Sequence, residues 1–187
     1  MQPFKNTDLS FETPRLILRP FTQADLYDFN AYASVPGVGE AAGWPHHKTL
    51  EESQKILDMF LRDQANFAIY HKADNKVIGS LGLHKSWTDE LEDYNHLSAY
   101  EMGYVLSKNY WGQGLVPEAA QAVINYLFND RKLDAISICH FLENAQSRRV
   151  IEKLGFTFIM EDIYYSKQMD KNFDDMKYLL LNPANKV

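Results

Sequence analysis

A chain of 187 residues with 45% hydrophobic and 24% charged residues is long enough for a full core, and we expect residues 1–187 to form a single domain. The net charge of −6 and the lack of a long apolar run argue against nucleic acid as the main partner and against a membrane-spanning segment. Cys139 is the single cysteine and the first residues lack the apolar core of a signal peptide, so we expect a cytoplasmic protein without internal disulfides.

The first half of the chain predicts a strand, two helices and then two strands. Charged and apolar residues alternate at 15–20, whereas apolar residues recur at helical spacing after Thr22 and after Thr49. Thr49 and Glu52 form a capping box, which marks the start of the second helix. The predicted elements are a strand at 15–20, a helix from 22, a glycine- and proline-containing loop at 34–48, a helix at 49–63, and strands at 66–71 and 76–83.

The second half predicts a strand, a helix, a strand, a helix and two closing strands. A polar stretch at 85–95 precedes them. Asn144 is suited to cap the last helix, and Gly155 is suited to end it. The predicted elements are strands at 98–106 and 134–141, helices from about 115 and at 144–154, and strands at 156–160 and 176–181. The order predicts a mixed α/β fold with about seven strands and four helices.

The most informative stretch is 109–118, where two glycines stand between a strand-like run and an amphipathic helix. Gly112 and Gly114 carry no Cβ, so the backbone there can adopt positive φ and approach a ligand closely. The first amides of the helix have no partner inside it, which favours an anion such as a phosphate. A dinucleotide fingerprint needs a third glycine where Pro117 stands, and a P-loop ending is absent. The alternative is an ordinary glycine-rich connection.

Four blocks in chain order resemble the GNAT superfamily of acyl-CoA-dependent N-acyltransferases, and within it the subgroup of ribosomal-protein N-terminal acetyltransferases. The blocks are residues 13–20, Glu101-Met102-Gly103-Tyr104-Val105-Leu106, the Gly112–Gly114 loop, and Asn144-Ala145-Gln146-Ser147 with the Glu152-Lys153-Leu154-Gly155-Phe156 that follows. The similarity covers about residues 13–182. The chain departs from the usual Gln/Arg-x-x-Gly-x-Gly/Ala loop at Trp111 and Val116.

The resemblance implies acetyl-CoA as the cosubstrate. It also implies a mostly antiparallel sheet that splays between its fourth and fifth strands, where the pantetheine arm of the coenzyme adds to a strand edge. Asn144 has two possible roles, because its side chain can cap its helix, bond a pantetheine carbonyl, or do both. The residues expected to bind the cofactor are Tyr104, Val105, Leu106, Gly112, Gln113, Gly114, Leu115, Asn144 and Ser147.

Acetyl transfer to an amine needs a base, because a protonated amine has no lone pair. Glu101 is the candidate base, since regular alternation places it near the splay. The alternative is a solvent-facing or salt-bridged strand residue. The resemblance places the hydroxyl of Ser147 near the coenzyme sulfur, where it would act as the acid for the leaving thiolate. Tyr164 or Tyr165 could take this role instead. A backbone amide near Val105 or Leu106 would hold the oxyanion.

The loop at 34–48 is expected to cover the acceptor side, with Trp44 and His46 as substrate-binding residues together with Tyr164. We expect no metal, because the remaining histidines are scattered and no Cys or carboxylate spacing accompanies His46 and His47. Cys139 and His140 are adjacent in a strand and therefore point to opposite faces, which argues against a Cys–His nucleophile.

The acceptor amine stays open at this stage. A protein or peptide N-terminus is the first hypothesis. A small amine such as a polyamine, an amino acid or an aminoglycoside is the second, and a non-catalytic acyl-CoA-binding module is the third. We expect a monomer or a homodimer, and no nucleic acid or membrane among the partners.

Overall fold

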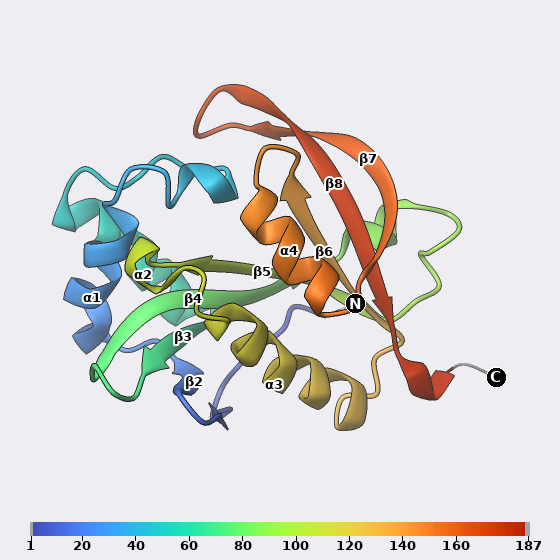
Figure 1. The fold of residues 1–187 in the computed structure, drawn as a ribbon, viewed down its shortest axis with the longest axis horizontal. Coiled ribbons are helices and arrows are strands. Elements are labelled where there is room, and N and C mark those ends of the chain that lie inside the picture. Colours follow the sequence, from blue (N-terminus) through green and yellow to red (C-terminus); the bar gives the residue numbers. More distant parts are fainter. Residues whose placement is uncertain (1, 186–187) are drawn as a thin grey trace.

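The computed structural model describes residues 2–185 and shows a single eight-stranded sheet in the order β1-β2-β3-β4-β5-β6-β8-β7 (Figure 1). The strands are β1 Phe11–Glu12, β2 Leu16–Pro20, β3 Asn66–His71, β4 Lys76–Lys85, β5 Ala99–Leu106, β6 Ala135–Phe141, β7 Thr157–Ser166 and β8 Lys171–Leu181. The α-helices are α1 Leu26–Ala33, α2 Leu50–Asp63, α3 Leu115–Asn129 and α4 Ala145–Lys153. The predicted mixed α/β class and the four helices are confirmed.

The predicted splay lies between β5 and β6. These two strands are the one parallel pair in the sheet, and they pair only at Ala99↔Ala135, Tyr100↔Ile136 and Glu101↔Ser137. Beyond Glu101, β5 continues to pair with β4 as far as Leu106, and β6 continues to pair with β8 as far as Phe141. The two halves of the sheet therefore separate at Glu101, and backbone groups of β5 that face away from β4 after this residue have no partner on β6.

The two faces of the sheet carry different helices. Tyr100, Met102 and Leu106 of β5 belong to the main core, together with residues of α3 and α4. Val105 packs on the other face against the core formed by α1 and α2. This alternation places Glu101 on the same face as Val105, and it agrees with the predicted strand.

The sheet differs from the predicted one at its two edges. The two-residue β1 was not predicted, and it raises the number of strands to eight. At the other edge, β7 and β8 extend through residues expected to connect them, and form a long hairpin. Most of β7 is exposed, so its sequence lacks the alternation of a half-buried strand. The backbone hydrogen bonds of β7 to β8 hold this segment as a strand, whereas burial of one of its faces contributes little.

Short 3-10 helices complete the chain at η1 Gln23–Asp25, η2 Glu40–Ala42, η3 Trp87–Glu90, η4 Lys108–Tyr110 and η5 Pro183–Asn185. The stretch expected to be a polar loop contains η3, whose Trp87 and Thr88 are buried. No helix within residues 2–185 is long and apolar enough to span a membrane.

Candidate active site

A continuous cleft of about 2080 Å³ runs through the gap between β5 and β6 and opens on both faces of the sheet. Most of the residues that the sequence singled out line it. They are Trp44, His46, Glu101, Tyr104, Val105, Leu106, Gly112, Gly114, Asn144, Ser147 and Tyr164. Gln113 and Leu115 are not among its lining residues, so any contact that they make with a ligand involves the backbone of the loop and of the first turn of α3.

The glycine loop has the backbone conformation that its sequence suggested. Gly112 and Gly114 adopt φ of 74° and 73°, in the left-handed region that L side chains avoid. A Cβ placed on Gly112 would meet nothing within 4 Å, so the backbone there is open to a ligand. Gly114 is the N-cap of α3 and supplies no side chain to its free amides. These amides are available to an anion.

A cluster formed by residues just before β2 and by the first turn of α3 fixes this loop in place. Arg15 donates from Nη1 to the Gln113 carbonyl oxygen at 2.9 Å and from Nε to Glu118 at 2.7 Å. Glu118 also accepts a hydrogen bond from the Thr13 hydroxyl at 2.6 Å. The Gln113 side chain bonds back to the Asn109 carbonyl oxygen at 3.0 Å. Arg15 therefore holds the Gln113 carbonyl oxygen and links the loop to Glu118 in the first turn of α3.

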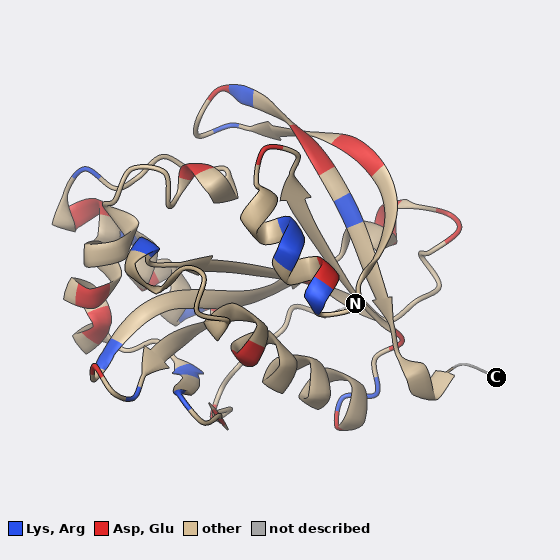
Figure 2. Cartoon of the chain, in the orientation of Figure 1, with Lys and Arg blue, Asp and Glu red and all other residues tan. Residues whose placement is uncertain are grey.

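Positive charge beside the loop comes from α4, which the sequence analysis did not identify. Arg149 and Lys153 stand four residues apart and both line the cleft. Arg148 instead pairs with Glu152 through a 2.8 Å contact from Nε. Figure 2 shows the basic bands on α4. An acidic protein that binds a polyanion needs positive side chains close to the binding site. The four-residue spacing of Arg149 and Lys153 on one helix could have identified them in the sequence.

Trp111, which stands where the family motif has Gln or Arg, has a structural role. Its indole N–H donates to the carbonyl oxygen of Leu106 at 2.8 Å, and Lys108 Nζ lies 5.6 Å from its ring centroid. The contact ties the end of β5 to the glycine loop, and it occupies one of the Leu106 backbone groups that pantetheine was expected to use.

On the α3–α4 face, Tyr104 and Ser147 meet across the cleft. Their hydroxyl oxygens are 2.8 Å apart. Burial raises the pKa of Tyr104 well above its usual value, so the phenol keeps its proton at neutral pH. The sequence predicts only backbone contacts for Tyr104, whereas the structure places its hydroxyl group next to that of Ser147. Tyr164 and Tyr165 lie on β7 instead, and the Tyr165 hydroxyl donates to Asp170 at 2.5 Å.

Asn144 uses both ends of its side-chain amide within the protein. Its Oδ1 accepts from the Ser147 backbone N–H at 3.0 Å and caps α4, as predicted, while its Nδ2 donates to the Ala41 carbonyl oxygen at 3.2 Å. The side chain thus joins α4 to η2 across the open end of the splay.

Asn144→Ala is expected to lower the free energy of unfolding by about 1–2 kcal/mol, because it removes the cap and the bond to Ala41. Asn144→Asp keeps an oxygen for the cap and is expected to lose less than half as much. Urea unfolding of both variants measures this. Equal losses in the two variants would contradict a dominant capping role.

Glu101 lies where the two halves of the sheet part. Its Oε1 is 3.7 Å from the Cys139 thiol of β6. Burial and then the nearby charge of Asp175 raise the pKa of Glu101 to about 7, against smaller opposing contributions from the Cys139 thiol, the Trp87 backbone and Lys177. A carboxyl group with this pKa can exchange a proton near neutral pH. Gly103, two residues on, leaves open space on the same face.

Trp44, His46 and Tyr164 lie on the Glu101 side of the cleft. His46 Nδ1 is 2.7 Å from Glu40, and the hydrogen bonds from His46 and nearby backbone groups outweigh burial and lower the pKa of Glu40 to about 2. The Tyr164 ring stacks on Phe141 at 5.7 Å between centroids. These contacts give the loop at 34–48 a defined shape over the acceptor side.

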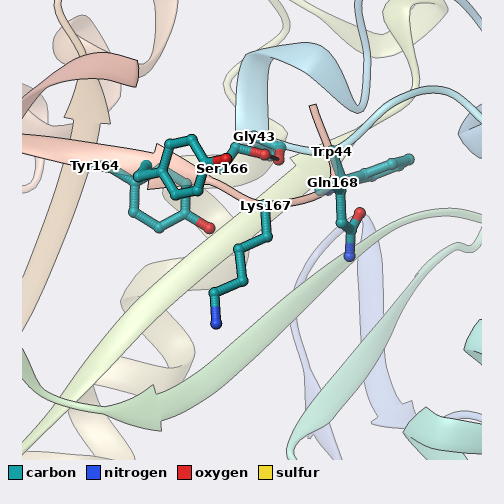
Figure 3. A pocket seen from close by; sticks show the side chains of 8 residues that line it. Gly43, Trp44, Tyr164, Ser166, Lys167 and Gln168 are labelled. Carbon is teal, nitrogen blue, oxygen red and sulfur yellow. Dashed lines mark hydrogen bonds between the residues drawn. The ribbon is translucent and has the colours of Figure 1, made fainter. Parts of the chain in front are cut away.

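The β7–β8 turn is fastened to this loop. Ser166 is buried and donates from its hydroxyl to the Gly43 carbonyl oxygen at 2.7 Å. Figure 3 shows Ser166 against Gly43, with Tyr164 and Gln168 nearby, around a pocket of about 390 Å³. A Cβ on Gly43 would lie 3.1 Å from both Phe141 and Tyr164, so glycine permits this close approach. This hydrogen bond joins the β7–β8 turn to the loop at 34–48.

Cys139 and His140 do not form a catalytic pair in this structure. Cys139 faces Glu101, whereas His140 Nδ1 bonds the Phe141 carbonyl oxygen at 2.8 Å and Nε2 lies 3.2 Å from the Tyr178 hydroxyl. Among residues 2–185, no group of three or more His, Cys, Asp or Glu residues is placed to hold a metal ion.

Residues 15–157 match the acetyltransferase (GNAT) domain family, and the chain belongs to this family. It is similar to an uncharacterized N-acetyltransferase p20 of Bacillus licheniformis, with 32% identity over 77% of this chain and 80% of the relative. This membership confirms the expected class, an acyl-CoA-dependent N-acyltransferase. Acetyltransferases of the GNAT family use acetyl-CoA as their cosubstrate.

Solved structures support the same fold. A GNAT-family acetyltransferase from Bacillus anthracis superposes with a TM-score of 0.80 at 24% identity, covering 93% of this chain and 99% of that one. The ribosomal-protein-S5-alanine acetyltransferase of Vibrio fischeri gives 0.69 at 20% identity, covering 96% and 100%. The spermidine N-acetyltransferase of Vibrio cholerae, solved with CoA and spermine, gives 0.70 at 16% identity, covering 91% and 97%.

Proposed function

We propose that this protein transfers the acetyl group of acetyl-CoA to the α-amine of a protein or peptide N-terminus. The observation that carries the proposal is the position of Glu101, a carboxyl group with a pKa of about 7 at the point where β5 and β6 separate. An α-amine has a pKa of about 7.7–8.0, so proton transfer from it to this carboxylate costs little. A lysine side chain, with a pKa of about 10.4, is a poorer match.

The cofactor half of the cleft fits acetyl-CoA. The free amides after Gly114 and the cations of Arg149 and Lys153 suit a pyrophosphate or phosphate group. The unpaired edge of β5 suits the amide groups of pantetheine. This arrangement directs the thioester towards the Tyr104–Ser147 pair.

The reaction then uses groups on both faces of β5. Glu101 accepts the proton from the bound ammonium group, and the free amine attacks the thioester carbonyl carbon. A backbone amide near Val105 or Leu106 stabilises the oxyanion. The C–N bond forms, and the attacking nitrogen, which now carries a positive charge, releases its second proton to solvent. The C–S bond breaks, the thiolate takes a proton from the Tyr104–Ser147 hydroxyl pair, and this pair regains a proton from solvent. The opposed positions of base and acid match this order of proton transfers.

The two hydroxyl groups are expected to substitute for each other. Tyr104→Phe or Ser147→Ala alone leaves one donor beside the thiolate, so each should lower kcat less than the double variant, which should lose at least about tenfold. Steady-state thiol release measures kcat, and the rise in melting temperature on adding CoA shows that the coenzyme still binds. A double variant with the kcat of the original chain would show that neither hydroxyl acts as the acid.

A small amine is the second candidate acceptor. A spermidine N-acetyltransferase is among the similar structures. The net charge of −6 also favours a cationic acceptor.

The decisive experiment is thiol release from acetyl-CoA with three acceptor pools: N-terminal peptides, polyamines with amino acids, and aminoglycosides. Turnover confined to peptides is the expected result. Turnover confined to another pool would replace the proposed acceptor. Silence in all pools, with CoA still raising the melting temperature, would favour a binding module.

A further inference from the structure

Asp175 of β8 is a buried carboxyl group that no role described so far requires. Its residue is 4% exposed, it lines the acceptor side of the cleft, and its Oδ1 has no hydrogen-bond partner among the described residues. Asp175 lies opposite Phe141 in the β6–β8 register, so it shares the face of Cys139. A buried polar atom without a partner is costly and rare in folded proteins, and an incoming donor would satisfy it.

The cation nearest to Asp175 along β8 is shared with another acid. Burial raises the pKa of Asp175, and the charge of Lys177 opposes this shift. Lys177 itself pairs with Asp162, and its Nζ lies 5.8 Å from the centroid of the Trp87 ring. His84 lies opposite Glu101 in the β4–β5 register, and desolvation of its ring lowers its pKa.

Farther along β8, Lys171 lies over the Phe173 ring, with Nζ 4.6 Å from its centroid. The Cys139 thiol lies between the two acids, since it contacts Glu101 and also interacts with Asp175. Glu101 and Asp175 therefore lie on the same side of the cleft, and a bound ammonium group would balance their negative charge.

We infer that Asp175 determines acceptor specificity. Together with Glu101 it admits a cationic primary amine and rejects an amine whose neighbouring carbon carries a carboxylate. The acceptor class is thus the peptide N-terminus and other amines without an adjacent anion, and free amino acids are excluded. This inference rests on the proposed acetyl transfer.

The physical reason is the charge next to the reacting nitrogen. A free amino acid brings its carboxylate within one carbon of the amine, and hence close to Glu101 and Asp175. Repulsion between like charges in a partly desolvated site is strong. A peptide or an amide carries a neutral carbonyl at the same position, so its ammonium group keeps the full attraction.

The test compares alaninamide with alanine as acceptors for the original chain, Asp175→Asn and Asp174→Asn. Asp174 is the adjacent, exposed residue on the other face of β8, and serves as the matched control. The original chain should strongly favour alaninamide in kcat/KM. Asp175→Asn should reduce that preference about tenfold, mainly through KM, because one buried charge is removed. Asp174→Asn should leave it unchanged.

A second measurement separates this inference from the proposed function. Calorimetric binding of alaninamide in the presence of CoA needs no turnover, and it should weaken about tenfold in Asp175→Asn. Equal use or equal binding of alanine and alaninamide by the original chain would overturn the inference, as would an unchanged preference in Asp175→Asn. Preferential binding of alaninamide without any thiol release would retain the specificity and reject the transferase.

Discussion

Glu101→Gln is expected to lower kcat by about 10²- to 10⁴-fold, because glutamine keeps the size and hydrogen bonds of the side chain but cannot accept the amine proton. Thiol release at saturating acetyl-CoA measures the loss. The original chain should also lose activity as the pH falls through about 7, where Glu101 becomes protonated. This acid limb should be absent in the variant, whose residual rate should follow deprotonation of the acceptor amine itself.

The matched control for this experiment is Glu161→Gln. Glu161 is exposed on β7, opposite Met176, and lies away from the cleft. Its replacement should change neither kcat nor the pH profile. A Glu101→Gln variant that kept most of its activity at pH 7 would contradict the proposed base and would leave His84 as the nearest alternative on the same face.

Gly112→Ala is expected to raise the KM for acetyl-CoA at least tenfold and to lower the free energy of unfolding by about 1–2 kcal/mol. The residue has φ of 74°, so a Cβ strains the backbone even though it meets nothing within 4 Å. Relaxation of that strain would turn the loop amides away from the phosphates. Initial rates at varied acetyl-CoA and urea unfolding give the two quantities.

Gly155→Ala separates binding from stability. Gly155 follows α4, has φ of 83°, and would also place its Cβ in open space. Its replacement should cost a similar amount of stability and leave the KM for acetyl-CoA unchanged. Equal KM values in the two variants would show that the Gly112 conformation does not serve the coenzyme.

Local patterns were sufficient for much of the site. The glycine spacing predicted the left-handed positions at Gly112 and Gly114, and Asn144 caps α4 as expected, because both effects act within a few residues of the chain. The alternation along β5 placed Glu101 on the face opposite Tyr104, since a strand permits only two directions for its side chains.

Local sequence patterns cannot predict contacts between segments that are far apart in the chain. The Tyr104–Ser147 pair joins residues 43 apart in the chain, and the Arg15 contact with Gln113 joins residues 98 apart. Asp175 is recognised only through the pairing of β8 with β6, because the sequence predicts a connection between strands at residues 161–175. The periodicity of apolar residues within a strand does not show which other strand lies beside it in the sheet.

The amino-acid sequence was enough to predict seven of the eight strands and all four helices in order, the backbone freedom at Gly112 and Gly114, a candidate base, and the resemblance to the family to which the chain belongs. Periodicity, backbone freedom at glycine and helix capping are local properties that the sequence carries directly. The spatial order of the eight strands, the hydrogen bond from Ser166 to Gly43, and the interaction between Glu101 and Asp175 became visible only in the folded structure. These features depend on strand register and on desolvation, which arise only when distant segments pack together.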